Sequence, residues 1–276
     1  MFSYIVTIII PCYNMGLLLL ETLDSVNKLV DPSVHEVLII NDGSSEAETL
    51  RVLDSLRDKY TIIDQANGGL SAARNTGIRA AKADYLIFLD ADNLLMPGYL
   101  QQGLEILEHH PDIDIVYGES YKFGAESGRL LTKEYSLHTL MTYNYIDACC
   151  LVRKSLFEDL GGFDEQMKLG YEDWEMWMRA GISGKKFHYL RDIVCQHYRV
   201  RSNSMVRSID KSKSYEIEQY IQDKHKHIVD FTGVSDFYYN KFSKSPLGWT
   251  AKLFIRKFLP RYYNHLVKKG RLRQNL

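Results

Sequence analysis

The segment Asp84-Tyr-Leu-Ile-Phe-Leu-Asp-Ala-Asp92 decides the fold of this chain: an apolar run typical of a buried strand is followed at once by two carboxylates. Ile5–Ile10 and 37–40 are similar runs of β-branched and aliphatic residues, the composition of strands that a parallel sheet buries on both faces, and the short run 61–63 is predicted as a further strand. Apolar residues recur at helical spacing between these runs, over 17–29, 46–60 and 70–82. This alternation predicts an α/β fold with a parallel central sheet flanked by helices.

Polar or glycine-rich residues follow every predicted strand. In such sheets ligands bind outside the carboxyl ends of the strands, so we expect a polar ligand site at this edge. Proline is also expected to end the first strand, at Pro11. The strand-end segments are Pro11-Cys-Tyr-Asn14, Asn41-Asp-Gly-Ser-Ser45, Asn67-Gly-Gly69 and Asp90-Ala-Asp92.

Composition and charge exclude several classes of protein. The 276 residues are 45% hydrophobic and 25% charged, as in ordinary globular proteins and unlike disordered or fibrous ones. A formal net charge of −1 gives no global field for nucleic acid. The four cysteines have no C-x-x-C spacing, which predicts reduced thiols, and no apolar run reaches the roughly 18 residues of a membrane span. We therefore expect a cytoplasmic protein.

Two acidic groups suggest chemistry when they are taken together. Two carboxylates separated by one residue, as in Asp90-Ala-Asp92, suit Mg²⁺ or Mn²⁺, although a helix N-cap would explain one of them. Glu172-Asp-Trp174 begins a predicted helix, where acidic residues are also favoured by the helix dipole. With His197 after a late predicted strand, the set provides metal ligands and a general base.

In order along residues 4–205, these segments resemble the large family 2 of inverting glycosyltransferases. The resemblance implies a GT-A fold, a mostly parallel sheet with a nucleotide-binding half and an acceptor half. It also implies metal-dependent transfer of a sugar from a UDP-sugar to a hydroxyl of a glycan or lipid-linked acceptor. It rests on Ile10-Pro-Cys-Tyr-Asn14, Asn41-Asp-Gly-Ser-Ser45, Gly69-Leu-Ser-Ala-Ala-Arg-Asn75, Asp90-Ala-Asp92, Gly162-Phe-Asp164 and Glu172-Asp-Trp174.

The resemblance assigns a role to each matching residue. Asp173 would be the catalytic base, and Asp92 with His197 would hold the Mn²⁺ or Mg²⁺ ion that bridges the two phosphates. Glu172, beside the base, would contact the acceptor or belong to the lid, and Asn203 and Ser204 would belong to a loop that closes over the donor. The donor would be bound by Pro11, Tyr13, Asn14, Asp42, Gly68, Gly69, Arg74, Asp90, Ala91 and Asp92.

Two positions depart from the family pattern. Asn41 begins the second motif where relatives often have Asp, and Asn93 follows the second carboxylate where many have a further Asp.

Two other residues are candidates for sugar contact from their positions. Glu119 follows a predicted strand near the cleft, and Trp174 could stack on a sugar ring, although helix packing is the alternative for that indole.

The predicted mechanism follows from charge. The departing sugar leaves negative charge on the β-phosphate, which the metal neutralises as a Lewis acid. Asp173 takes the proton of the acceptor hydroxyl, and a single displacement inverts the anomeric configuration.

We expect a glycosyltransferase domain over 1–205, with a nucleotide-sugar half (1–96) and an acceptor and catalytic half (97–205), and a helical extension over 206–276. Strands near 186–189 and 194–198 are expected to close the sheet. Residues 247–273 interleave aromatic and basic side chains as interfacial helices do. No acidic residue follows Asp236, so the rest of the chain has a net negative charge. Three partners fit this segment: the inner face of the membrane, that acidic remainder of the chain, or a second subunit of a homo-oligomer. A lipid-linked acceptor would suit the first, in assembly of a surface polysaccharide.

Three other functions are weighed against this one. A sugar-phosphate nucleotidylyltransferase shares a similar core but usually has a Gly-rich loop with Arg after the first strand, where this chain has Pro11-Cys-Tyr-Asn14. A Rossmann dehydrogenase is disfavoured because no G-x-G-x-x-G follows that strand. A non-catalytic sugar-nucleotide-binding relative would not need Asp173.

Overall fold

The computed structural model describes residues 5–201 and 211–226. The chain divides into two compact units, Met1–Lys224 and His225–Leu276. Asn203, Ser204 and the segment 247–273 lie outside the described residues, so their roles stay predictions, as does the domain boundary expected after residue 205. Among the residues described, we find no helix with the length and apolar character of a membrane span.

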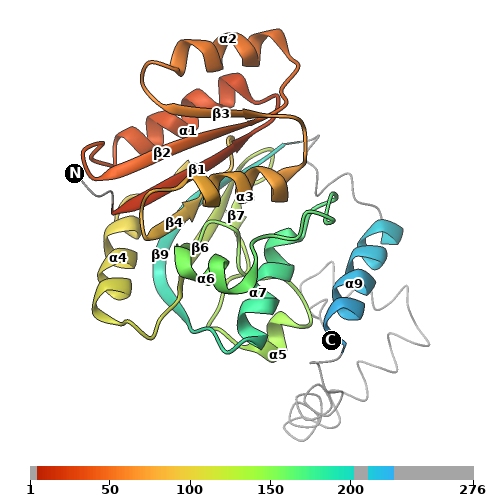
Figure 1. The fold of residues 1–276 in the computed structure, drawn as a ribbon. Coiled ribbons are helices and arrows are strands. Elements are labelled where there is room, and N and C mark those ends of the chain that lie inside the picture. Colours follow the sequence, from red (N-terminus) through yellow and green to blue (C-terminus); the bar gives the residue numbers. More distant parts are fainter. Residues whose placement is uncertain (1–4, 202–210, 227–276) are drawn as a thin grey trace, which may run out of the picture. The chain divides into compact units, whose positions relative to one another are not determined.

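Four parallel strands form the first half of the sheet, with helices as the crossovers between them (Figure 1). Their order in the sheet is β3-β2-β1-β4, so all four end at the same edge. This arrangement confirms the predicted alternation. In chain order the elements are β1 (Val6–Cys12), α1 (Gly16–Asn27), β2 (His35–Asp42), α2 (Ala47–Leu56), β3 (Thr61–Gln65), α3 (Leu70–Ala80) and β4 (Tyr85–Phe88).

The second half of the sheet is mixed. β8 (Leu151–Arg153) pairs antiparallel with β4 and with β6 (Ile115–Gly124), and β9 (Phe187–Val200) runs parallel to β6. Because β8 is antiparallel to β4, the chain entering β8 lies at the edge where β4 ends. The remaining elements are the short strands β5 (Leu94–Leu95) on β9 and β7 (Gly128–Arg129) on β6, and the helices α4 (Tyr99–His109), α5 (Leu137–Leu140), α6 (Lys154–Leu160), α7 (Glu172–Ile182) and α9 (Lys211–His225).

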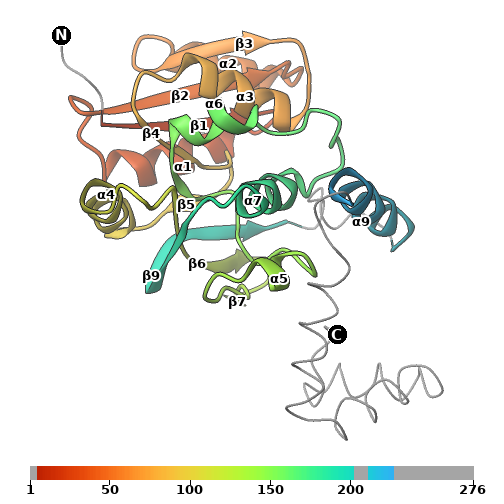
Figure 2. The ribbon, with the colours of Figure 1, turned by 60° about the horizontal axis from the view of Figure 1, so that its bottom comes forward.

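Helices cover both faces of the sheet (Figure 2). Successive side chains of a strand point to opposite faces, so β1 contributes to two separate cores. Ile8 and Ile10 pack with apolar residues of α1, α2 and α4, whereas Ile9 packs with those of α3, α6 and α7. All three are fully buried, and each burial contributes about 1.5–3 kcal/mol. The α/β fold with helices on both sides is therefore confirmed.

The predicted end of the first strand at Pro11 is wrong, because β1 continues to Cys12. Ile9 accepts a hydrogen bond from Leu89 on the β4 side of β1, and Pro11, two residues later, faces the same side. Pairing with β4 ends at Ile9↔Phe88, whereas pairing with β2 continues to Cys12↔Asn41. The missing N–H of Pro11 therefore breaks no hydrogen bond of the ladder.

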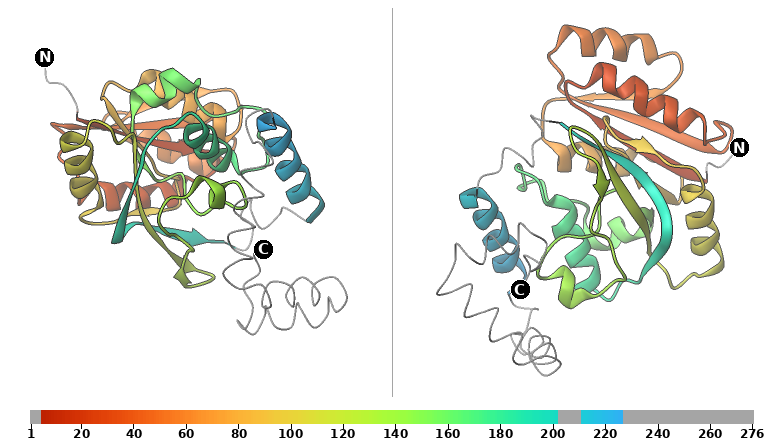
Figure 3. Two further views of the ribbon diagram at one scale, coloured as in Figure 1. Left: turned by 90° about the horizontal axis from the view of Figure 1, so that it is seen from below. Right: turned by 180° about the vertical axis from the view of Figure 1, so that it is seen from behind.

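The two strands expected near 186–189 and 194–198 are one long strand, β9, whose bend is visible in Figure 3. Its register with β6 shifts between Tyr117 and Ser120, and Asp192 has a left-handed φ of 62°. A bulge of this kind absorbs extra residues and bends a strand without ending its pairing. The polar residues between the two apolar runs therefore mark a bulge and not a loop.

Candidate active site

Asp90 and Asp92 lie on the turn that follows β4. The Asn93 amide donates to the Asp90 carbonyl (3.0 Å), which closes the turn. The Asn93 side chain is 1% exposed and accepts a hydrogen bond from the backbone N–H of Arg199 on β9 (2.9 Å). An amide oxygen makes this contact without adding another buried charge to the turn, which is a physical reason for Asn at this position.

Arg74 on α3 joins this turn to the start of α7. Its guanidinium is 1% exposed and forms ion pairs with Asp90 (2.9 Å) and with Glu172. Burial by itself would lower the pKa of Arg74, but Glu172, Asp90 and Asp173 together raise it above its ordinary value. The charge of Arg74 is thus permanent, and two carboxylates already share it.

Asp173 lies in the first turn of α7. Its carboxylate accepts hydrogen bonds from the Trp174 amide (2.7 Å) and from Asn144 Nδ2 (3.0 Å). Burial, followed by the charges of Glu172 and Asp147, raises the pKa of Asp173 to about 8. A carboxyl group with a pKa near neutrality has the proton affinity of an effective general base.

Sequence reasoning missed two residues of this group. Asp147 precedes β8 and accepts hydrogen bonds from the Cys149 amide (2.9 Å) and Gln196 Nε2 (2.7 Å). Burial and then the charge of Asp90 raise its pKa to about 6. The pKa of Tyr198 on β9 is raised by burial and then by four carboxylates, those of Asp90, Asp92, Asp147 and Asp173. One tyrosine therefore experiences all four charges.

Asp147 was not recognisable from the sequence because its importance depends on strand direction. In the register of β8 with β4, Ile87 pairs with Leu151, so residue 147 lies beyond the end of β4, beside the Asp90–Asp92 turn. An antiparallel assignment for β8 would have indicated this position. A polar residue just before a strand is otherwise an ordinary loop residue.

Asp42 holds the glycine-rich loop that follows β3. Its two carboxylate oxygens accept hydrogen bonds from the amides of Gly68 (2.8 Å) and Gly69 (2.9 Å), and Gln65 Nε2 donates to it at 2.7 Å. Lys168 contacts the same loop through the Gly68 carbonyl. The structure thus brings together three of the predicted donor-binding residues.

Asn14 connects the end of β1 to the start of α2. It has a left-handed φ of 54°, and its side-chain oxygen accepts hydrogen bonds from the amides of Ser45 (2.8 Å) and Glu46 (3.0 Å). Tyr13 beside it is 48% exposed, whereas Ala91 is buried. Of these residues, Tyr13 exposes the most surface, and Asn14 shapes the loops around it.

The predicted metal ligands do not form a complete protein site in the part of the chain described. There, no three His, Cys, Asp or Glu side chains are grouped so that they could hold a metal ion. The centroid of the His197 ring lies 6.1 Å from that of the Phe123 ring. The neighbouring Gln196 donates to Asp147, and because successive side chains of a strand point to opposite faces, His197 lies on the face of β9 away from Asp147. Asp92 pairs with Arg201 (Nε to Oδ2, 2.8 Å). The metal-binding roles of Asp92 and His197 stay predictions.

The two residues proposed for sugar contact are largely enclosed. Glu119 is 2% exposed and is bound by Arg129 and by the Tyr189 hydroxyl (2.9 Å). Trp174 is 5% exposed, and its indole N–H donates to the Leu140 carbonyl. Both side chains organise their surroundings in this structure, and acceptor contact by either stays a prediction.

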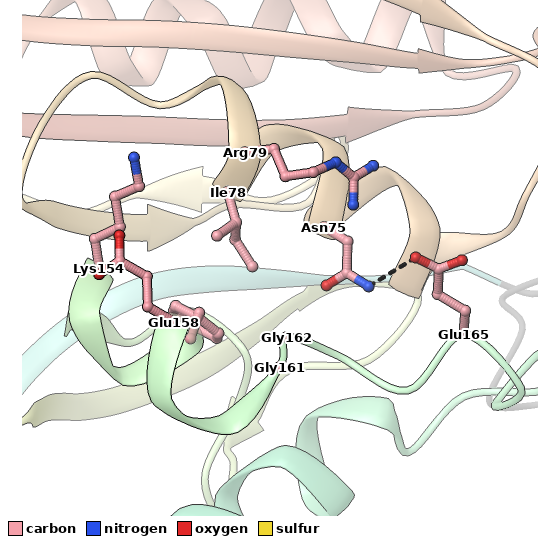
Figure 4. A pocket seen from close by; sticks show the side chains of 9 residues that line it. Asn75, Ile78, Arg79, Lys154, Glu158, Gly161, Gly162 and Glu165 are labelled. Carbon is pink, nitrogen blue, oxygen red and sulfur yellow. Dashed lines mark hydrogen bonds between the residues drawn. The ribbon is translucent and has the colours of Figure 1, made fainter.

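A surface pocket lies between α3 and α6 and contains none of the predicted site residues (Figure 4). At its edge Asn75 donates to the Glu165 carboxylate (2.9 Å) and to the Phe163 carbonyl (2.9 Å), and it accepts from the Phe163 amide (2.8 Å). A Cβ on Gly162 would lie 2.5 Å from Asn75 Oδ1. Asn75 and Gly162 thus join two of the sequence motifs for structural reasons.

Comparison with known proteins gives the family. A family model described as glycosyl transferase family 2 matches residues 7–161, more than half of the chain. The chain belongs to glycosyltransferase family 2. It is 30% identical over 223 residues to the minor teichoic acid biosynthesis protein GgaB of Bacillus subtilis (strain 168), covering 73% of this chain and 24% of that one. It is also 35% identical over 141 residues to the uncharacterized glycosyltransferase EpsJ of the same strain, covering 47% of this chain and 40% of that one.

Solved structures agree on the fold of this family 2 member. The structure of S. aureus TarS residues 1–349 in complex with UDP-GlcNAc matches with a TM-score of 0.68 at 20% identity, over 87% of this chain and 73% of that one. At this identity the match shows the fold alone, which confirms the predicted GT-A architecture. The chain spans only a quarter to two fifths of the lengths of GgaB and EpsJ, so similarity to them covers part of each relative.

Proposed function

We propose that this chain transfers a sugar from a UDP-sugar to a hydroxyl of a glycan or lipid-linked acceptor, with inversion at the anomeric carbon. The observation that carries the proposal is the convergence of Asp90 with Glu172 and Asp173, from segments far apart in the sequence, around the buried Arg74. The UDP-GlcNAc in the TarS structure supports the donor class, and the name of GgaB supports assembly of a surface polymer.

Asp173 removes the proton from the acceptor hydroxyl in this mechanism. The acceptor oxygen forms a bond to the anomeric carbon while the bond from that carbon to the β-phosphate oxygen breaks and its electrons go to the phosphate. The hydrogen bonds from Asn144 and the Trp174 amide fix the carboxylate without protonating it. A base held in one orientation within reach of the hydroxyl contributes about 10²- to 10⁴-fold to the rate.

Arg74 and Asp42 position the groups around the reaction. Arg74 fixes Asp90 relative to the α7 start, so the distance between the donor side and the base is set by ion pairs and not by flexible loops. Asp42 orders the Gly68-Gly69 backbone, which we propose forms one wall of the nucleoside site. Asp42 would also accept a hydrogen bond from the uracil ring.

A Mn²⁺ or Mg²⁺ ion was predicted to neutralise the diphosphate. Asp90 and Asp92 are hard oxygen ligands, and magnesium sites often use one or two carboxylates together with substrate phosphates. However, Arg74 pairs with Asp90, and Arg201 pairs with Asp92. Because arginines already balance both carboxylates, the described donor set does not fit a metal held by the protein itself. Metal dependence stays a prediction.

The place of action is also a proposal. We assign the reaction to the cytoplasmic side of the membrane, where the basic segment 247–273 would contact anionic lipids. This placement suits a lipid-linked acceptor.

The test is release of UDP from a panel of UDP-sugars by the purified chain, followed by determination of the product's anomeric configuration by NMR. Asp173→Asn should lower turnover at least 10²-fold, whereas the matched control Asp58→Asn, an exposed acid after α2, should leave it unchanged. Full turnover by the Asp173→Asn variant would refute the role of the base. A product with retained configuration would refute the single displacement.

A further inference from the structure

The described site around Asp90 and Asp92 holds more carboxyl groups than the two arginines, Arg74 and Arg201, that pair with them. The carboxylates of Asp90, Asp92, Asp147 and Asp173 all act on Tyr198. A donor with two phosphates would bring about two further negative charges into this region, where like charges repel strongly because the dielectric is low. Binding of such a donor therefore needs a positive charge that points at the phosphates.

Arg74 is poorly placed to provide that charge. Its guanidinium is 1% exposed, and it is committed to Asp90 and Glu172 from two sides. Its ring contact with Phe163, 5.3 Å from the centroid, covers it further. A phosphate could reach it only by breaking a buried ion pair, which is costly.

Arg201, just beyond β9, is placed differently. Its side chain is 25% exposed, and its one ion pair within the described residues is with Asp92, which is 16% exposed. Arg201 Nε lies 2.8 Å from Asp92 Oδ2, but its N–H is not directed at that oxygen and makes no hydrogen bond there. The pair is therefore held by the attraction of opposite charges alone. The guanidinium thus lies beside the second carboxylate of Asp90-Ala-Asp92 without being fixed by hydrogen bonds to it.

The end of β9 is itself firmly held, which gives Arg201 a defined position. The backbone N–H of Arg199 donates to Asn93 Oδ1 (2.9 Å), and its side chain donates to the Asp92 carbonyl (2.9 Å). Its guanidinium also lies 4.4 Å from the ring centroid of Phe123. Arg199 therefore anchors the strand to the turn after β4, and Arg201 follows two residues later, just beyond the strand, where it pairs with Asp92 of that turn.

We propose that Arg201 binds the diphosphate of the donor and supplies the positive charge for which a divalent cation was predicted, so that donor binding does not require a metal. This inference rests on the proposed function, since it assumes a nucleoside diphosphate ligand. A guanidinium presents several N–H groups in a planar fork that matches phosphate oxygens. Asp92 then serves to orient the arginine.

The experiment measures UDP binding by calorimetry to the full chain, once in EDTA and once with Mn²⁺. For the unaltered chain we expect the dissociation constants in the two conditions to agree within about threefold. Arg201→Gln should weaken binding about 10- to 100-fold in EDTA, the effect of losing charge-assisted hydrogen bonds. Arg201→Lys keeps the positive charge but loses the planar fork of N–H groups, so its dissociation constant in EDTA should lie between those of the unaltered chain and of Arg201→Gln. The matched control is Arg191→Gln, an exposed arginine of the same strand that pairs only with the exposed Glu134 in the described structure.

Each outcome distinguishes the inference from the proposed function. UDP binding that appears only with Mn²⁺ would overturn the inference and leave the proposed function intact. Binding in EDTA that Arg201→Gln does not weaken would overturn it as well. No UDP binding in either condition would overturn the proposed function and the inference with it. Thermal melting of each variant identifies any that fails to fold. If Arg201→Gln does not fold, UDP binding by Arg201→Lys is compared with that of the unaltered chain instead.

Discussion

The raised pKa of Asp173 predicts an unusual pH dependence. A general base acts only when it is ionised, and kcat/KM reports ionisation in the free enzyme. With a pKa of about 8, Asp173 is about 1% ionised at pH 6, about 9% at pH 7 and about half ionised at pH 8. We therefore expect kcat/KM to rise about ninefold from pH 6 to 7, and less than twofold from pH 8 to 9.

The assay is initial-rate UDP release at several donor concentrations, with each buffer matched in ionic strength. The Asp58→Asn control, at an exposed acid, should reproduce the profile of the unaltered chain. An aspartate with its ordinary pKa near 3.8 would give a flat profile over this range. A flat profile from pH 6 to 9 would refute the reasoning that burial and neighbouring charges control this base.

The same shift predicts an effect on stability of the opposite sign. The folded state keeps the Asp173 proton up to about pH 8, whereas the unfolded chain loses it near pH 4, so stability from this group falls as pH rises between these values. Asp173→Asn removes a charge whose burial is costly. We expect its Tm to exceed that of the unaltered chain at pH 8 and to equal it at pH 4. A lower Tm at pH 8 would contradict this linkage.

Three further substitutions test the surroundings of the site. Arg74→Met leaves the buried Glu172 and the half-buried Asp90 without their partner and should lower the free energy of unfolding by about 3 kcal/mol or more in urea titrations. A loss below about 1 kcal/mol would mean that these ion pairs are not structural. Gly162→Ala places a Cβ 2.5 Å from Asn75 at a φ of 79° and should lower the free energy of unfolding by about 1–3 kcal/mol. The control Gly161→Ala has a similar φ but open space around it and should lower the free energy of unfolding by only about 1 kcal/mol. Equal losses would show that the contact with Asn75 is unimportant. Asp147→Asn removes one of the charges that raise the pKa of the base and should move the kcat/KM profile to lower pH, a shift that no purely structural role would produce.

The arrangement of ion pairs explains why the carboxylates converge. Arg74 and Glu172 are 98 residues apart in sequence, yet their contact fixes the start of α7 beside the turn after β4. The sequence predicted that the acidic groups at 90–92 and 172–173 would share one cleft, and the charges that act together on Arg74 agree with that prediction. The resemblance of the motifs to family 2 is likewise confirmed by the family match.

Other features were beyond the reach of sequence patterns. Pro11 was expected to end a strand because proline lacks a donor, but the strand continues where no donor is needed. Asp147 looks like a loop residue until β8 is known to run antiparallel to β4. Tyr198 lies in β9, and Arg201 directly follows the strand; the bulge of this strand shifts the register of the residues after it.

The amino-acid sequence by itself determined the strands and helices of the first half, the polar strand ends and the family motifs, because these depend on the spacing of residues close together in the chain. Only the tertiary structure decided which charges are neighbours. Electrostatic energy depends on distances through space and on burial, and for Asp173, Arg74 and Arg201 both are set by segments about a hundred residues away.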